Sequence, residues 1–349
     1  MNVLILAGGM GTRLYPLTWG RPKGIVPIAN KPFMERMLSW LQSYGMTEVV
    51  LALNYLPQMI SDQLGDGSTW GLKLDYLIED EPLGSGGAIK NAQHLMGSET
   101  FLVLNGDVFT DLDLGQMIEF HRQRGAQMTI SLAEVDDPSG FGVVEMAADG
   151  RLRRFVEKPP KEEAPSRYIN AGAWLFEPEI LDKMPERGKP FSIEREFWPL
   201  CLEQGVPMYG YPGNCYWLDI GTVERYKEAH RDLLAGRVST DIEEPETAPG
   251  IRVGAGAQVS CNAQLVPPVI IGAGAEIADG AQVSGSVVGA GCKIGPRAVL
   301  QESIIWEGAE IGADAEVLNS VVGARQKVAE GHILNDTALP DYGACAPKG

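Results

Sequence analysis

A glycine-rich loop near the start of the chain carries residue types suited to binding phosphates. It follows the apolar run Val3-Leu4-Ile5 and reads Leu6-Ala7-Gly8-Gly9-Met10-Gly11-Thr12-Arg13. Glycines remove the Cβ atoms that keep a backbone away from a ligand, and they leave peptide N–H groups free to point at anionic oxygens. Arg13 adds a permanently charged, fork-shaped donor. The loop predicts a phosphate site; the alternative is an ordinary strand-to-helix turn, which glycines also serve.

Two kinds of group could complete such a site. Lys23, in Arg21-Pro22-Lys23, follows closely enough to add a second cation, although a lysine beside a proline is also an ordinary solvated loop residue. Asp107 follows the apolar run Phe101 to Leu104, and Asp219 lies between bulky apolar residues. Magnesium on a nucleotide needs only one or two carboxylates. Asp107 and Asp219 are therefore predicted as its ligands, with a turn or cap role for Asp107 as the alternative.

A later segment combines a cation with hydrogen-bond acceptors. Glu157 and Lys158 are adjacent, and Asn170 follows after a short loop. A phosphorylated sugar needs a cation for its phosphate and acceptors for its hydroxyls, which these side chains supply. Adjacent residues of a strand face opposite ways, so an ordinary surface charge pair is the alternative.

An acidic and glycine-rich stretch runs from Glu79 to Ala88, ahead of a predicted helix. A carboxylate at a strand end can accept two parallel hydrogen bonds from the N1–H and N2–H₂ edge of guanine, which adenine, uracil and thymine do not offer. Glu79 is thus a candidate reader of the base. Helix capping is the alternative.

Composition excludes several classes of protein. The 349 residues carry a net charge of −17, which disfavours nucleic-acid binding, so a phosphate site must be built locally. No apolar run is long enough for a membrane span and no basic leader precedes the first one, so a cytoplasmic protein is expected. Neither a disulfide framework nor a zinc site is indicated by the widely spaced cysteines Cys201, Cys215, Cys261, Cys292 and Cys345.

The first half of the chain alternates between strand and helix patterns. Strands are predicted at 2–6, 48–53, 72–78 and 101–104, and helices from Phe33 to a stop at Gly45, at 57–64 and at 86–96. This order predicts an α/β fold with a doubly wound, mostly parallel, Rossmann-like sheet. Ligands are expected beyond the carboxyl ends of its strands, where the glycine loop and Asp107 both fall.

The second half carries an internal repeat. After a predicted helix at 223–234 and an acidic, proline-bearing stretch, aliphatic residues recur in steps of six, six and five, and positions 271, 288, 305 and 322 are 17 apart. This pattern is typical of a hexapeptide parallel β-helix. The sequence thus predicts a catalytic domain at 1–238, a linker at 239–250, a β-helix at 251–332 and a C-terminal tail at 333–349. Such solenoids also occur in acyltransferases, but the histidine base they usually need is missing from 251–331.

In order along the chain, these motifs resemble the sugar-1-phosphate nucleotidyltransferases, many of which carry a left-handed β-helix. The resemblance covers residues 1 to about 235 through the glycine loop, Arg21-Pro22-Lys23, Glu81-Pro82-Leu83-Gly84, Asn105-Gly106-Asp107, Phe141-Gly142-Val143-Val144, Glu157-Lys158-Pro159, Asn170-Ala171-Gly172 and Trp217-Leu218-Asp219-Ile220-Gly221-Thr222. It implies a metal-assisted in-line displacement, in which a sugar-1-phosphate oxygen attacks the α-phosphorus of a nucleoside triphosphate and pyrophosphate leaves.

The resemblance also implies roles for residues. The catalytic set is Arg13, Lys23, Asp107 and Asp219, with Mg²⁺ on Asp107 and Asp219. The nucleotide set is Leu6, Ala7, Gly8, Gly9, Gly11, Thr12, Arg13, Lys23, Glu79, Gly84 and Asp107. The sugar-phosphate set is Gly142, Glu157, Lys158, Asn170 and Asp219.

GTP and mannose 1-phosphate are the favoured substrates, and homo-oligomerisation through the β-helix is expected, with neither nucleic acid nor membrane as a partner. Glucose-1-phosphate thymidylyl or uridylyl transfer is the alternative. A non-catalytic regulatory homologue is the third, and it would be expected to lack some of the catalytic residues.

Overall fold

The computed structural model describes residues 1–341, so Cys345 and part of the predicted tail at 333–349 lie outside the described residues. The chain forms two compact units, each drawn from two stretches of sequence. We call residues 1–9 with 37–217 the sheet unit, and residues 10–36 with 218–349 the β-helix unit. These two compact units do not coincide with the domains predicted from the sequence, so the predicted domain boundaries stay predictions.

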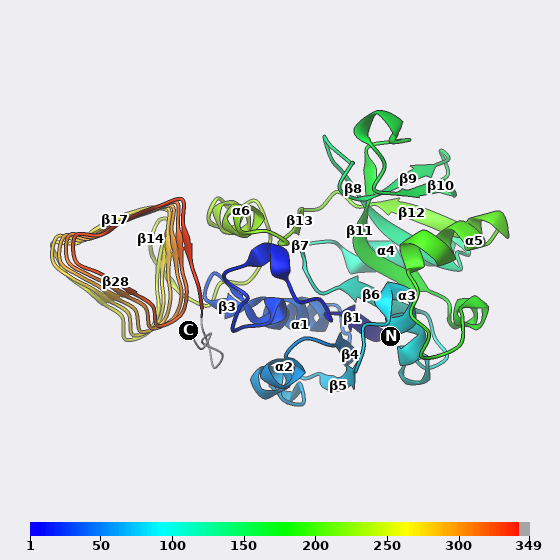
Figure 1. The fold of residues 1–349 in the computed structure, drawn as a ribbon, viewed down its shortest axis with the longest axis horizontal. Helices are drawn as coiled ribbons and strands as arrows, with labels where there is room; N and C mark the ends of the chain where they lie inside the picture. The colour runs from blue at the N-terminus through cyan, green and yellow to red at the C-terminus, as the bar shows by residue number, and fades with distance from the viewer. Residues whose placement is uncertain (342–349) are drawn as a thin grey trace. The chain divides into compact units, whose positions relative to one another are not determined.

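Four parallel strands in the order β6-β1-β4-β5 form one side of the sheet, with β5 at its edge (Figure 1). Leu4 pairs with Val50 on one side and Val103 on the other. Strands β1, β4 and β6 are largely buried and read as near-continuous apolar runs, as expected for parallel strands covered on both faces, whereas the edge strand β5 is mostly half-buried or exposed. Their bounds are β1 (Asn2–Leu6), β4 (Glu48–Leu53), β5 (Lys73–Ile78) and β6 (Phe101–Asn105).

Antiparallel strands continue the sheet beyond β6. Strand β11 pairs antiparallel with β6, β8 and β9, while β12 lies parallel to β8. The predicted α/β fold is confirmed, and the sheet is mixed because these later strands return by antiparallel pairing. Their bounds are β8 (Met128–Glu134), β9 (Gly142–Met146), β10 (Leu152–Glu157), β11 (Tyr168–Phe176) and β12 (Met208–Pro212), with the short β7 (Val108–Thr110) and β13 (Trp217–Asp219) nearby in sequence.

Helices form where the sequence supplies both an apolar face and end signals. The Asp113 side chain accepts a hydrogen bond from the Gln116 N–H at the start of α4, and Gly125 ends the helix in the left-handed region. The α-helices are α1 (Phe33–Ser43), α2 (Pro57–Leu64), α3 (Gly84–Ala92), α4 (Leu114–Arg124), α5 (Trp198–Glu203) and α6 (Val223–Leu234).

Shorter helical turns are η1 (Thr12–Leu14), η2 (Lys23–Ile25), η3 (Ser68–Trp70), η4 (Gln93–Leu95), η5 (Lys161–Glu163), η6 (Pro178–Lys183) and the π-turn η7 (Ile193–Phe197). In the part of the chain that the structure describes, we find no helix with the length and apolar character needed to cross a membrane.

The β-helix is a stack of triangular coils (Figure 1). Its three parallel sheets follow the predicted period: Ile271, Val288, Ile305 and Val322 stack in register. Coil interiors are filled by these aliphatic side chains. The strands are β14 (Glu246–Ala248), β15 (Ile251–Val253), β16 (Gln258–Val259), β17 (Gln264–Val266), β18 (Val269–Ile271), β19 (Glu276–Ile277), β20 (Gln282–Ser284), β21 (Val287–Val288), β22 (Lys293–Ile294), β23 (Val299–Gln301), β24 (Ile304–Ile305), β25 (Glu310–Ile311), β26 (Glu316–Leu318), β27 (Val321–Val322), β28 (Lys327–Val328), β29 (Ile333–Asn335) and β30 (Ala338–Leu339).

A ladder of hydroxyl groups stabilises one corner of the β-helix. The Ser286 Oγ accepts from the Ser303 N–H at 3.0 Å, Ser303 Oγ from Ser320 N–H at 3.2 Å, and Ser320 Oγ from Thr337 N–H at 3.0 Å. The three serines are fully buried, so each hydroxyl satisfies a backbone group that the corner would otherwise leave unpaired. The ladder repeats once per coil and explains why serine or threonine recurs every 17 residues.

The β-helix unit also contains residues 10–36, α6 and residues 239–250. A two-residue hairpin joins β2 (Pro27–Ile28) to β3 (Lys31–Pro32), with Ala29 and Asn30 both at positive φ. The Asn30 amide donates to Glu244 Oε1 at 2.8 Å, and Glu244 is buried. The stretch predicted as a linker is therefore packed within this unit.

Candidate functional site

A cavity of about 300 Å³ opens at the carboxyl ends of the parallel strands in the sheet unit. Its lining includes Leu6, Gly8, Gly9, Glu79 and Gly84 among the predicted nucleotide residues. Ala7 continues the strand direction, since its N–H donates to Ala52 O at 2.9 Å. The structure thus gathers residues from β1, the end of β5 and the start of α3 around one hollow, where a parallel α/β sheet is expected to bind ligands.

Two asparagines of this cavity were not predicted as site residues. Asn54 follows β4 and Asn105 ends β6, and both line the hollow. The Asn54 amide also donates to the backbone oxygen of Glu79 at 2.8 Å. Both follow strands that were predicted, so the rule that ligands bind beyond strand ends could have found them.

Glu79 stands out by its unsatisfied carboxylate. Its Oε2 accepts from the Leu83 N–H at 3.2 Å, whereas its buried Oε1 has no hydrogen-bond partner among the residues that the structure describes. Burial raises the pKa of Glu79, and the Leu83 hydrogen bond opposes this only in part. A buried acceptor without a partner costs free energy unless a ligand completes it.

Glycines shape the walls of this region. Gly84 has φ +72, and a Cβ there would lie 2.7 Å from the backbone oxygen of Phe191. A Cβ on Gly106 would lie 2.9 Å from both Ala7 Cβ and Leu6 O. The turn that carries Asp107 therefore lies against the glycine loop because its preceding residue has no side chain.

Four of the five predicted sugar-phosphate residues lie in the sheet unit, whereas Asp219 lies in the β-helix unit. Glu157 pairs with Gly142, and a Cβ on Gly142 would lie 2.9 Å from the Glu157 carboxylate. Lys158 Nζ lies 3.9 Å from Glu157 Oε1, and Lys158 itself has φ +50. Asn170 lies on β11, which pairs with β9 at Ile169. Its Oδ1 accepts from the Trp174 indole at 2.7 Å and the Gly172 N–H at 3.0 Å.

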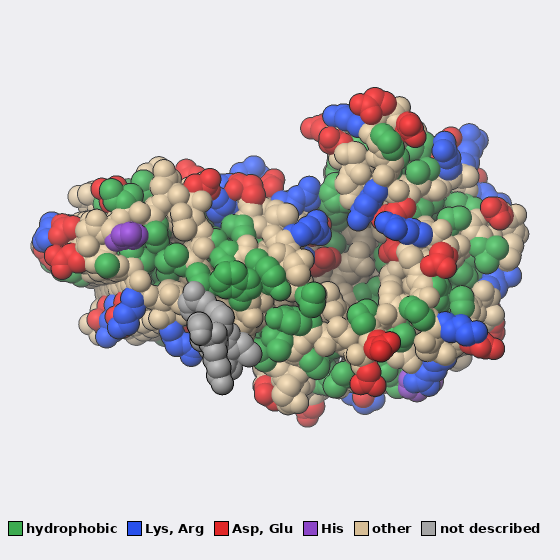
Figure 2. Space-filling view, in the orientation of Figure 1, with side chains coloured by type: hydrophobic (Ala, Val, Ile, Leu, Met, Phe, Trp, Pro, Cys, Tyr) green, Lys and Arg blue, Asp and Glu red, His purple; other side chains and the backbone are tan. Residues whose placement is uncertain are grey.

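The ionisation of Glu157 is also shifted. Burial, and then the charge of Glu194, raise its pKa, while Lys158 and Arg195 oppose the shift. A half-buried carboxylate beside a cation suits the binding of a hydroxyl and a phosphate. On the face drawn in Figure 2, acidic and basic side chains are interspersed over the sheet unit, so the net negative charge does not form one broad patch there.

Three predicted catalytic residues come together within the β-helix unit. Asp219 Oδ2 lies 3.8 Å from Arg13 Nη2, and Asp219 Oδ1 lies 3.7 Å from Lys23 Nζ. Arg13 is 68% exposed, whereas Lys23 is 10% and Asp219 18% exposed. The two cations flank one carboxylate, and the exposed Arg13 has room to move toward a ligand.

Two glycines make this arrangement possible. Gly11 has φ +65, and a Cβ there would lie 3.2 Å from Lys23 Cβ. A Cβ on Gly221 would lie 2.8 Å from Asp219 Oδ1 and 2.9 Å from Arg13 Nη2. Thr12 begins the η1 turn, which presents Arg13.

The carboxylates suit a nucleotide-bound metal rather than a protein-enclosed one. Within residues 1–341 there is no group of three or more His, Cys, Asp or Glu placed to hold a metal ion. Magnesium on a nucleotide needs one or two carboxylates, with phosphate and water oxygens as its other ligands, and Asp219 offers such an oxygen donor beside Arg13 and Lys23. Asp107 and Asp219 belong to different units, so their shared role stays a prediction.

Residues 2–236 match the family described as nucleotidyl transferase. The chain belongs to that family. Residues 251–345 of this nucleotidyl transferase match the LbH domain of the EIF2B subunit epsilon, in agreement with the predicted left-handed β-helix.

Named relatives cover most of the nucleotidyl transferase. It is 37% identical to a mannose-1-phosphate guanylyltransferase of Mycobacterium tuberculosis, over 87% of this chain and 79% of that protein. Mannose-1-phosphate guanylyltransferase 1 of Arabidopsis thaliana is also 37% identical, over 87% and 85%. A UTP--glucose-1-phosphate uridylyltransferase of Synechocystis is 33% identical, over 87% and 82%.

Among solved structures, HddC from Yersinia pseudotuberculosis complexed with GMP-PN is 34% identical to the nucleotidyl transferase, with a TM-score of 0.56. The match covers 65% of this chain and 97% of HddC.

Proposed function

We propose that this enzyme transfers GMP from GTP to mannose 1-phosphate and releases pyrophosphate. The observation that carries the choice of base is Glu79, which lines the strand-end cavity and whose buried Oε1 has no hydrogen-bond partner in the described part of the chain. Relatives named mannose-1-phosphate guanylyltransferase support the choice of both substrates.

Glu79 and guanine are chemically complementary. Guanine presents N1–H and N2–H₂ side by side, and an ionised carboxylate accepts from both. Adenine offers an acceptor at N1, and the pyrimidines lack the paired donors. A site that buries an acceptor for a substrate donor discriminates strongly against bases that leave it unpaired.

The phosphates would be bound by the cations around Asp219. We propose that Arg13 and Lys23 neutralise the triphosphate and the leaving pyrophosphate, while Asp107 and Asp219 bind Mg²⁺. Magnesium, when bound, supplies charge neutralisation at the phosphate oxygens. The backbone of Gly8, Gly9 and Gly11 would admit the phosphates at close range. The protein then accelerates in-line attack on the α-phosphorus chiefly by positioning and electrostatics.

The sugar 1-phosphate would be bound by the second group of residues in the sheet unit. Lys158 supplies the cation for its phosphate and Glu157 an acceptor for its hydroxyls, while Asn170, whose Oδ1 already accepts two hydrogen bonds, offers its side-chain N–H₂ as a donor. Gly142 lets the Phe155 ring and the Glu157 carboxylate pack closely against β9, since a Cβ there would lie 2.4 Å from the ring and 2.9 Å from the carboxylate. The choice of mannose over glucose is supported by the relatives and not by a particular contact.

Substrate profiling tests this proposal. Pyrophosphate release is measured for GTP, ATP, UTP and dTTP, each with mannose 1-phosphate and glucose 1-phosphate. We expect the highest kcat/KM for GTP with mannose 1-phosphate. Turnover of UTP or dTTP with glucose 1-phosphate, and none with GTP, would refute the assignment of both substrates.

Glu79→Gln tests the role of the carboxylate. The variant replaces one acceptor by a donor that opposes guanine N–H, so we expect kcat/KM for GTP to fall by about 10²- to 10⁴-fold, from the loss of one or two charge-assisted hydrogen bonds. Use of UTP or dTTP should rise relative to GTP. Asp80→Asn removes a neighbouring exposed carboxylate and serves as the matched control. An unchanged base preference in Glu79→Gln would exclude Glu79 as the reader.

A thymidylyl or uridylyl enzyme is the second candidate, because one relative is named a UTP--glucose-1-phosphate uridylyltransferase. A glutamine would be expected at position 79 in that case. A regulatory homologue without activity is disfavoured, since Arg13, Lys23, Asp107, Lys158 and Asp219 are all present. A cytoplasmic location and a homo-oligomer built through the β-helix stay predictions.

A further inference from the structure

Arg21 lies two residues before Lys23, the proposed phosphate-binding lysine, and its side chain contacts the β-helix. Arg21 Nη2 lies 2.5 Å from Glu307 Oε1, and Arg21 Nε lies 2.7 Å from Asp341 Oδ2. The guanidinium also lies over the Trp306 ring, 5.0 Å from its centroid. Arg21 is 14% exposed, so this is a largely buried three-way contact within one compact unit.

Anchoring Arg21 restricts Lys23. Pro22 separates the two residues, and its ring fixes φ, here at −64°. The next turn is closed by hydrogen bonds from Ile25 N–H to Pro22 O and from Val26 N–H to Lys23 O. A displacement of the Arg21 backbone is therefore expected to move Lys23 as well.

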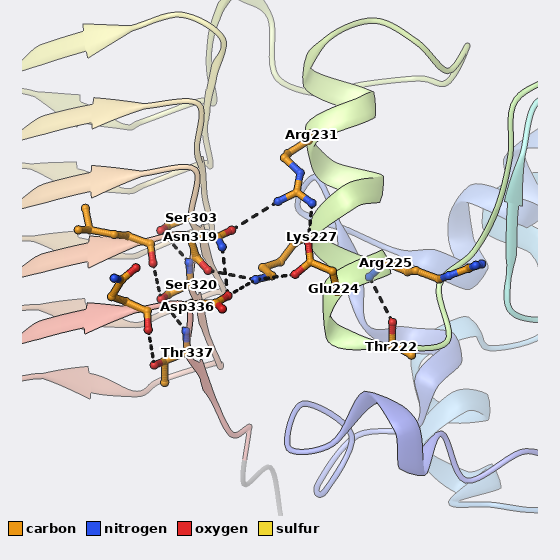
Figure 3. Close-up of polar contacts among 12 residues, drawn as sticks. Thr222, Glu224, Arg225, Lys227, Arg231, Ser303, Asn319, Ser320, Asp336 and Thr337 are labelled. Carbon is orange, nitrogen blue, oxygen red and sulfur yellow. Dashed lines mark hydrogen bonds and ion pairs between the residues drawn. The ribbon is translucent and has the colours of Figure 1, made fainter. Parts of the chain in front are cut away.

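A second anchor holds the segment that carries Asp219. Helix α6 begins four residues later, and its Lys227 Nζ donates to Asp336 Oδ1 at 2.6 Å and to Asn319 O at 3.3 Å (Figure 3). Arg231 reaches the Asn319 side chain at 3.4 Å, and Glu224 binds both cations from the same helix. The helix is thereby fastened to one corner of the β-helix.

This corner is built to be rigid. Asn319 and Asp336 stand one coil apart, both at positive φ, and the Asn319 amide donates to Asp336 Oδ1 at 3.1 Å. Behind them runs the ladder through Ser303, Ser320 and Thr337 (Figure 3). The stacking of the coils thus fixes the positions of Asn319 and Asp336, which bind Lys227.

Trp306 connects the two anchors. Its indole N–H donates to the Tyr226 hydroxyl at 2.9 Å, and that hydroxyl donates to Pro27 O. Trp306 and Tyr226 are almost completely buried. One β-helix side chain therefore contacts Arg21 through its ring and α6 through its nitrogen.

From these contacts we propose that the β-helix belongs to the catalytic apparatus: Trp306, Glu307 and Asp341 are positioning residues that hold Lys23 in place opposite Asp219. The proposal rests on the proposed function, because it assigns Lys23 to the triphosphate and pyrophosphate. Removing one partner leaves the largely buried charge of Arg21 less well compensated, so we expect Arg21 to move while the coil keeps its fold. A shift of about 1 Å in a phosphate-binding cation is enough to lower the rate by about 10²-fold.

The test uses the full-length enzyme with Glu307→Gln and, as a second variant, Asp341→Asn. We expect kcat to fall about tenfold or more, with a smaller effect on the KM for the sugar 1-phosphate, because four of its five predicted binding residues lie in the sheet unit. Arg21→Lys should lower kcat similarly, and combined with Glu307→Gln it should add little, since both remove the same anchor. Glu276→Gln, an exposed acid on a different face of the β-helix, is the matched control and should retain wild-type kinetics.

Binding of inorganic pyrophosphate, measured by calorimetry, separates this proposal from the choice of substrates. We expect about tenfold weaker binding in Glu307→Gln and Asp341→Asn, with thermal unfolding used to confirm that each variant is folded. Wild-type kcat and pyrophosphate affinity in both folded variants would overturn the positioning role. Failure of GTP with mannose 1-phosphate, alongside weakened pyrophosphate binding in the variants, would overturn only the substrates.

Discussion

Replacing Gly221 with alanine tests whether the placement of Arg13 and Asp219 sets the reaction rate. The added Cβ would lie 2.8 Å from Asp219 Oδ1 and 2.9 Å from Arg13 Nη2. Both distances are shorter than 3.0 Å, below which Cβ contacts are essentially never found in proteins. Both end groups must therefore move by about half an ångström or more to reach ordinary contact. Because both are ends of flexible side chains, the backbone has no need to follow.

The expected effect is large on activity and small on stability. A misplacement of about 1 Å costs about 10²-fold in rate, so two groups moved by roughly half that distance should lower kcat by about 10- to 100-fold. Gly221 does not have a left-handed φ, so alanine adds no backbone strain there. We expect the Tm to stay within about 2 °C of the wild type.

The assay compares pyrophosphate release and thermal unfolding in Gly221→Ala with the same measurements in Gly140→Ala. Gly140 also lacks a left-handed φ, and a Cβ there would have no atom within 4 Å, so this control should match the wild type. Wild-type turnover in a folded Gly221→Ala would refute the reasoning. A large loss of Tm would instead assign Gly221 a structural role.

Two further predictions concern pH and metal. His230 accepts a hydrogen bond from the Ala29 N–H, and burial lowers its pKa to about 4. The neutral form of His230 therefore stabilises the fold above pH 6.5, the usual pKa of a free histidine. This contribution to the free energy of unfolding, about 3 kcal/mol, is lost as the pH falls toward 4. Urea unfolding between pH 7 and 4.5 should show it, and a His230→Asn variant with the same pH slope would contradict it. Asp107→Asn should lower magnesium-dependent turnover about 10²-fold or more with Tm unchanged; full activity would remove Asp107 from the metal site.

Periodic features of the sequence predicted the fold well. The helix predicted at 223–234 has the bounds of α6, and the strand predicted at 48–53 has those of β4. The spacing of 17 predicted the coil, because each coil repeats the same inward position. Such elements are fixed by local burial patterns, which a sequence displays directly.

Contacts between distant residues were not predictable in this way. Arg21 and Glu307 are 286 positions apart, and no repeat relates them. The sequence suggested a phosphate role near Arg21, whereas the structure shows its guanidinium on the β-helix. For Glu79, the strand end was visible in the sequence, but the missing partner of Oε1 depends on how α3 and the cavity pack around it.

The coil of 17 residues also determines how far along the β-helix axis each residue lies. Removing 17 residues between 286 and 303 would leave the hydroxyl ladder and the stacked aliphatic residues able to re-form, since the coils there repeat the same contacts every 17 residues. Residues beyond the deletion would nevertheless move by one strand spacing, about 4.8 Å. Glu307 would then be beyond the reach of Arg21. The number of coils before Glu307 therefore decides whether Glu307 can reach Arg21, and the loss or gain of a coil there should be disfavoured.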